Sequence, residues 1–129
     1  MGSAIIAKGD FEQAIDSLKK ALLISSNFSN AHNNLGIALK NIGSLSEAIE
    51  SFKKAIKIDP LNPQAFYNLG DDFLEKGDLD FAIDSYKRAI DINPDFNDAY
   101  LNLGIALEQR KKDSHWILIE LDLNAKYYI

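Results

Sequence analysis

The sequence contains no cysteine, which excludes a disulfide-stapled fold and any metal site built on thiolates. Basic residues are in the minority, since 14 lysines and arginines stand against 19 aspartates and glutamates and give a formal net charge of -5. A nucleic-acid partner is therefore not expected, because phosphate binding needs a basic surface. No apolar run approaches the roughly 18 residues of a membrane span, and no signal-peptide pattern is present. We expect a cytoplasmic protein with no nucleic-acid partner and no membrane partner.

Residue patterns that carry catalysis are sparse as well. The two histidines, His32 and His115, lie far apart, and no spacing places a nucleophile beside a base. Asp71, Asp72 and Glu75 lack the calcium-loop spacing and its glycine, so we expect them to form a solvated helix surface. No GxxxxGK[ST] run is present to form a phosphate loop. The sequence therefore predicts no enzyme activity, no cofactor and no metal site.

What the sequence does contain is an internal repeat. Gly36, Gly70 and Gly104 are separated by 34 residues at each step. Four further series have the same period: Gly9, Gly43 and Gly77; Ala14, Ala48 and Ala82; Ala21, Ala55 and Ala89; Pro60 and Pro94. Within one period, two stretches with helical spacing of apolar residues flank a glycine that can end the first helix, and a proline follows the second. Each unit is therefore expected to be a helix hairpin whose small residues allow close packing and which must stack on its neighbours.

These units resemble a known family. The run Asn34-Leu35-Gly36-Ile37-Ala38-Leu39, followed by Gly43, Ala48, Phe52, Ala55 and Asp59-Pro60, resembles the tetratricopeptide repeat (TPR), and the unit from Asn68-Leu69-Gly70 to Asn93-Pro94 matches again. The resemblance implies an all-α fold, a right-handed superhelical solenoid of antiparallel helix hairpins. It divides the chain into a partial first repeat (1–28), two complete repeats (29–62 and 63–96) and a partial repeat with an irregular C-terminal capping segment (97–129). In the first part we expect a short helix over residues 4–8, a turn at Gly9, and a second helix over residues 11–24.

The repeat pattern breaks near the C-terminus. The next turn glycine would fall at position 111, which is Lys111, and Trp116 and Leu123 occupy positions where earlier repeats have alanine. We expect a separate helix from Ser114 to about Tyr128 that covers the helix before it, although the alternation of residues 117–124 also fits a strand. As a helix this tail is apolar on most sides, which is typical of a buried element. A homodimer formed through residues 114–129 is therefore also open.

In the TPR family the first helix of each hairpin lines a concave groove. Here that helix carries an asparagine before each Leu-Gly pair, at Asn34, Asn68 and Asn102. A column of amides can hydrogen-bond to the backbone of an extended peptide, and it resembles the asparagine ladder in the TPR region of the O-linked N-acetylglucosamine transferases. The other groove residues that the resemblance implies are Asn30, Asn33, Ile37, Tyr67, Asp71 and Asp98. The alternative is that these asparagines bond between helices.

The leading hypothesis is a protein–protein interaction module that binds an extended peptide segment through its asparagine ladder. Chaperone-binding members of the family grip a peptide carboxylate with basic residues, whereas a carboxylate here would meet Asp98. The expected partner is therefore another protein that offers a neutral or basic segment. Two alternatives stay open: a substrate-recruiting fragment of a larger enzyme such as a glycosyltransferase, or a self-assembling structural solenoid that uses the apolar C-terminal tail.

Overall fold

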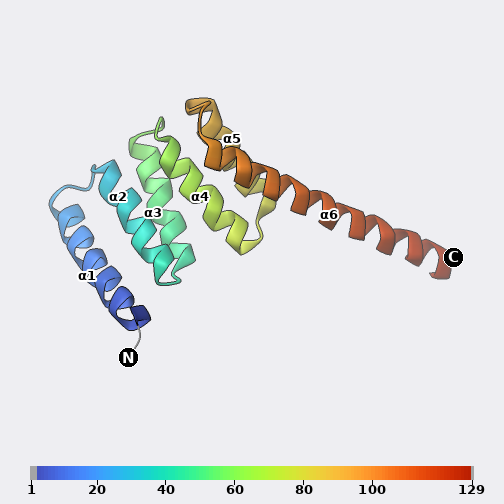
Figure 1. Cartoon of the computed structure of the whole chain (residues 1–129), viewed down its shortest axis with the longest axis horizontal. Coiled ribbons are helices and arrows are strands. Elements are labelled where there is room, and N and C mark those ends of the chain that lie inside the picture. The colour runs from blue at the N-terminus through green and yellow to red at the C-terminus, as the bar shows by residue number, and fades with distance from the viewer. Residues whose placement is uncertain (1–2, 129) are drawn as a thin grey trace.

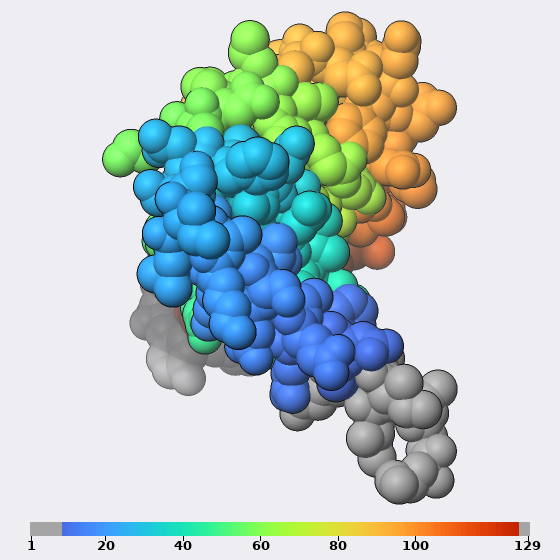
Figure 2. Space-filling model, turned by 90° about the vertical axis from the view of Figure 1, so that its left-hand side faces the viewer, coloured from blue at the N-terminus to red at the C-terminus, as the bar shows by residue number. Residues whose placement is uncertain are grey.

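The computed structural model describes the backbone of residues 3–128 and the side chains of residues 9–126. Within that range the protein is all helical, and successive helices lie side by side along the stack (Figure 1). The six helices are α1 (Ser3–Ile24), α2 (Ser29–Asn41), α3 (Leu45–Ile58), α4 (Pro63–Lys76), α5 (Leu79–Ile92) and α6 (Asn97–Tyr128). Seen from the N-terminal end, the colours step round from α1 at the bottom to the later repeats at the upper right (Figure 2). The predicted all-α stack of antiparallel helix hairpins is confirmed.

The hairpin turns form at the glycines that the repeat predicts. Gly43 and Gly77 have φ angles of +85° and +86°, a left-handed conformation that is costly for other residues. After each glycine the next backbone N–H reaches back to the preceding helix, from Ser44 to the carbonyl of Leu39 and from Asp78 to that of Phe73. These bonds satisfy carbonyls that a helix end would otherwise leave unpaired. The turns therefore join α2 to α3 and α4 to α5 as tight hairpins.

The small residues of the repeat lie where the two helices of a hairpin approach closely. A methyl group added to Gly36 would lie 2.6 Å from Cε1 of Phe52, and one added to Gly70 would lie 2.7 Å from Cε1 of Tyr86. Both rings are completely buried. The predicted close packing is confirmed, and each glycine provides the space for one aromatic ring of the facing helix.

The expected break in the first repeat is wrong. No turn forms at Gly9, and α1 runs without interruption from Ser3 to Ile24. A glycine inside a helix costs only about 1 kcal/mol relative to alanine. Gly43 and Gly77 end helices that pack between two others. A glycine alone does not make the turn.

The expected structure of the tail is also wrong. No turn forms near Lys111, and α6 continues for 32 residues, so that its second half projects beyond the other helices (Figure 1). A lysine in the left-handed conformation is disfavoured, and the residues around it favour helix. The tail is therefore neither a strand nor a separate helix that covers residues 97–110, and the expected irregular capping segment is regular helix. Among the helices described, none has both the length and the apolarity needed to cross a membrane.

Candidate peptide-binding face

The residues predicted to bind a peptide lie on α2, α4 and α6, the first helices of successive hairpins. α2 contacts α4, and α4 contacts α6, so these three helices form one layer. Asn34 is exposed on α2, while Asn68 on α4 and Asn102 on α6 are partly buried. Of the other predicted residues, Asn30, Ile37 and Asp98 are exposed, Tyr67 and Asp71 are partly buried, and Asn33 is buried. We call this surface the α2–α4–α6 face.

Two of the three asparagines hydrogen-bond to the preceding first helix. The Nδ2 of Asn68 donates to Oδ1 of Asn33 over 3.2 Å. The Nδ2 of Asn102 donates to Oδ1 of Asp71 over 2.9 Å and to the hydroxyl of Tyr67 over 3.2 Å. These bonds join α2 to α4 and α4 to α6, which is the alternative role considered for the asparagines. Beyond them, one N–H of Asn68 and the Oδ1 of Asn102 are left to contact a ligand.

Asp71 is the centre of a polar cluster on this face. Its Oδ1 accepts a hydrogen bond of 2.5 Å from the buried hydroxyl of Tyr86, and its Oδ2 lies 3.9 Å from Nζ of Lys40. Burial, followed by the neighbouring carboxylate of Asp71, raises the pKa of the Tyr86 hydroxyl. Burial also raises the pKa of Tyr67, and the charges of Asp71 and Asp98 add to that effect. Both phenols therefore stay protonated at neutral pH; Tyr86 donates to Asp71, and Tyr67 accepts from Asn102.

Asp72 departs from the expected solvated surface, because its side chain is 0% exposed. Neither carboxylate oxygen has a hydrogen-bond partner among the described residues, and the closest cation is Nζ of Lys40, 3.8 Å from Oδ1. Burial raises the pKa of Asp72 to about 7; the charge of Lys40 lowers it, and the charges of Glu75 and Asp71 raise it. The equivalent positions in the neighbouring repeats, Ala38 and Ala106, are buried alanines. Aligning the repeats would have revealed this burial, whereas considering Asp71-Asp72 as one acidic patch concealed it.

The charges of this face are mostly negative. Lys40 is shared between Asp71 and Asp72, so its charge is largely neutralised. Glu75 and Asp98 add two exposed carboxylates. Within the described part of the chain, no group of three or more His, Asp or Glu side chains is arranged to hold a metal ion. The face therefore offers amide, phenol and carboxylate groups for noncovalent contacts.

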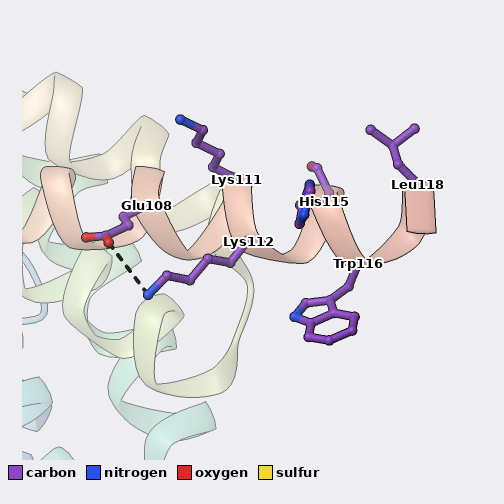
Figure 3. Close-up of a pocket in the computed structure, with 7 residues that line it drawn as sticks. Glu108, Lys111, Lys112, His115, Trp116 and Leu118 are labelled. Atoms are coloured by element: carbon purple, nitrogen blue, oxygen red, sulfur yellow. Dashed lines mark ion pairs between the residues drawn. The ribbon is translucent and has the colours of Figure 1, made fainter. Parts of the chain in front are cut away.

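A hollow lies along the projecting part of α6. It is lined by Glu108, Lys111, Lys112, Ser114, His115, Trp116 and Leu118. All of these residues belong to one helix, and Figure 3 shows them spread along it, with Trp116 and Leu118 on different sides. Lys112 forms an ion pair with Glu108, with an N–O distance of 3.6 Å. Since no second element faces it, this hollow is an exposed surface of the tail.

Comparison with known proteins agrees with the repeat structure. A family model described as TPR repeat matches residues 2–43, 41–71 and 70–110. A crystal structure of MamA shares 34% sequence identity at a TM-score of 0.77, and the match covers 86% of this chain and 66% of that one. This chain therefore spans about two thirds of the length of that MamA chain. No match is found among curated proteins.

Two further solved structures share the fold at lower identity. The first TPR of Spaghetti (RPAP3), bound to the HSP90 peptide SRMEEVD, is 17% identical with a TM-score of 0.78, over 84% of this chain and 93% of its own. A mutant O-GlcNAc transferase from Thermobaculum terrenum is 21% identical with a TM-score of 0.67, over 83% of this chain and 23% of its own. At these identities the likeness shows the fold alone.

Proposed function

The chain belongs to the tetratricopeptide repeat family, and on that premise we propose that it binds an extended segment of another protein along the α2–α4–α6 face. As a TPR protein it is a protein-interaction module, and in this proposal it acts by binding and not by catalysis. The RPAP3 repeat domain, which shares the fold, is bound to an HSP90 peptide. The alternative of a substrate-recruiting fragment of a larger enzyme stays a prediction.

The observation that carries the proposal is the spacing of the asparagines on this face. Asn34, Asn68 and Asn102 lie on three successive first helices. Hydrogen bonds to the preceding first helix hold the side chains of Asn68 and Asn102 in place. Packed helices are separated by about 8–10 Å, and an extended chain advances about 3.3 Å per residue. One asparagine contact every three residues or so therefore suits an extended peptide. Amides that are already oriented lose little side-chain entropy on binding.

The charge of the face decides which peptide it favours. Asp98 and Glu75 are exposed, and Asp71 retains 19% side-chain exposure beside Tyr67. An acidic peptide such as SRMEEVD would be repelled by these carboxylates. A neutral segment avoids this repulsion. A lysine or arginine side chain of the segment is attracted to the same carboxylates.

Selection from a randomised peptide library displayed on phage tests this proposal. We expect neutral or basic sequences to be enriched, and the double charge reversal Glu75→Lys with Asp98→Lys to reduce their binding tenfold or more. The matched control is Asp16→Lys with Asp91→Lys, two exposed carboxylates on α1 and α5. Enrichment of acidic sequences, no enrichment at all, or an equal loss in the control would contradict the proposal.

We also propose that residues 114–129 join two copies of the chain. Trp116 and Leu123 are 66% and 46% exposed along one side of the projecting helix. Soluble monomers rarely leave grouped large apolar side chains in water. Light scattering is expected to give the mass of a dimer for the intact chain and that of a monomer for Trp116→Glu with Leu123→Glu. A monomeric intact chain would contradict this second proposal and leave the first unaffected.

A further inference from the structure

α6 is a first helix without the second helix that should pack on it. Gly104 has the same position in the repeat as Gly36 and Gly70, which lie against the rings of Phe52 and Tyr86. A methyl group added to Gly104, in contrast, would meet nothing within 4 Å. Tyr100 and Leu101, which flank Gly104 on the helix surface, are 49% and 65% exposed. We call these three residues the open Gly104 face.

The segment that should cover this face is part of the same straight helix. By the period of the repeat, residues 113–126 correspond to α3 and α5, which fold back after the left-handed glycines Gly43 and Gly77. With Lys111 in place of that glycine, the segment continues away from the residues it would cover (Figure 1). In this straight helix, both the open Gly104 face and the segment that would cover it are exposed. Exchange of such an element between two copies restores the missing packing.

The tail carries an apolar stripe on the side required for this packing. Trp116, Ile119 and Leu123 recur at helical spacing, and Trp116 and Leu123 occupy the repeat positions of the alanines that lie against the first helix in α3 and α5. Glu120, one turn after Trp116, occupies the position of the buried rings Phe52 and Tyr86. The stripe therefore lies on the side of the helix that packs in the other repeats, but its large ring, Trp116, comes one helical turn before the position of Phe52 and Tyr86.

This displacement of the ring favours exchange over folding back within one chain. The short turn of two or three residues fixes the register of a hairpin. In that register Glu120 would oppose Gly104, and Trp116 would be forced into the space of an alanine that is 0% exposed in the other repeats. Between two copies no turn fixes the register, so the helices can shift by one turn and place the indole against Gly104. In that register the indole of Trp116 fills the space beside Gly104 and does not overpack the position of an alanine.

We propose that the chain dimerises by exchanging its C-terminal helical segment, so that the Trp116–Ile119–Leu123 stripe of each copy docks on the open Gly104 face of the other. The inference rests on the proposed self-association through residues 114–129 and names the surface that receives the tail. The two α6 helices run antiparallel, with a two-fold axis near the middle of α6. Each copy contributes one stripe and one face, so the contact is closed and does not propagate. The side of the tail that carries Trp116 is separate from that of Leu118 (Figure 3).

Light scattering on the full chain with Gly104→Lys tests the inference. Because nothing lies within 4 Å of this position, the variant is expected to fold and to be helical, yet to weaken the dimer at least tenfold. The matched control is Gly9→Lys, the same change in α1 at a glycine that also has nothing within 4 Å, and it is expected to leave the dimer intact. Circular dichroism of both variants separates loss of the dimer from loss of the fold.

Cross-linking identifies the docked surfaces directly, because the chain has no cysteine of its own. A copy with Gly104→Cys and a differently tagged copy with Glu120→Cys are mixed and treated with a short thiol-to-thiol cross-linker. We expect a covalent heterodimer from this pair, and none when Glu12→Cys on α1 replaces Gly104→Cys. A dimer that survives Gly104→Lys and gives no cross-link to position 104 overturns the exchange while self-association stands. A monomeric intact chain overturns both.

Discussion

The side chain of Asn102 on α6 hydrogen-bonds to the carboxylate of Asp71 on α4, with 2.9 Å between Nδ2 and Oδ1. The same oxygen accepts the hydroxyl of the buried Tyr86, so three helices meet at one carboxylate. An asparagine that the sequence assigns to a ligand is therefore also a structural link between successive repeats. This double role decides which mutations can test peptide binding without disturbing the fold.

Replacing Asn102 is expected to lower stability. Asn102→Ala removes an amide that donates to the charged Asp71 and to Tyr67, and hydrogen bonds to charged groups contribute about 1.5–3 kcal/mol. Since the site is only partly buried, we expect the free energy of unfolding to fall by about 1–2 kcal/mol in urea denaturation. Asn34→Ala, at the exposed equivalent position, should change it by less than about 0.5 kcal/mol. Equal effects of the two substitutions would contradict the structural role of Asn102.

The buried carboxylate of Asp72 predicts an unusual dependence of stability on pH. Its pKa is about 7 in the folded chain, against 3.8 for the unperturbed group, so the folded state binds the proton more tightly than the unfolded state. The contribution of Asp72 to the free energy of unfolding is therefore most favourable below about pH 4. It falls as the pH rises towards 7, and above that pH it falls no further. Thermal melting between pH 4.5 and 8.5 measures this slope.

The substitution Asp72→Ala restores the residue type found at Ala38 and Ala106 and should remove that slope. Each pKa unit corresponds to roughly 1.4 kcal/mol, so at pH 8 the variant is expected to be more stable by the order of a few kcal/mol. Lys40 keeps Asp71 as a partner and is not left without a counter-charge. If the variant shows the same pH slope as the original chain, or is less stable at pH 8, Asp72 is not the source of the dependence.

One substitution should have opposite effects at two glycines of the same register. Gly36→Ala places a methyl group 2.6 Å from Cε1 of Phe52, and such overpacking costs typically about 1–3 kcal/mol. In the monomer, Gly104→Ala meets nothing within 4 Å and gains the helix propensity of alanine, about 1 kcal/mol. Denaturation of the two variants, at concentrations where light scattering gives the mass of a monomer, measures both signs. Destabilisation of the monomer by Gly104→Ala would mean that the surface of Gly104 is already covered within the single chain.

The central hairpins could be predicted from the sequence because several local signals agree there. At Gly43 a turn glycine follows one amphipathic stretch and precedes another, and both helices have neighbours to pack on. Gly9 has the same residue type at the same position of the repeat, and the chain passes through it as helix. Lys111 stands where the repeat predicts a turn glycine, and α6 continues through it as helix. Turn formation depends on packing partners as well as on the turn residue.

The predicted binding residues could be placed on a common face but their contacts could not be foreseen. The repeat period locates Asn34, Asn68 and Asn102 on successive first helices. Whether an amide points to a ligand or to its neighbour depends on what the preceding helix offers, and here Asn33 and Asp71 offer acceptors. Those contacts join residues about one repeat apart, which a reading of single helices does not consider.

The most direct test of the peptide-binding proposal follows the side-chain amides themselves. In ¹⁵N-labelled protein titrated with a basic peptide selected by phage display, the side-chain NH₂ resonances of Asn34, Asn68 and Asn102 report on contact without any mutation. The account predicts that these resonances and the backbone resonances of α2, α4 and α6 shift together as the peptide saturates. Shifts confined to α3 and α5, with the three amides unchanged, would contradict it.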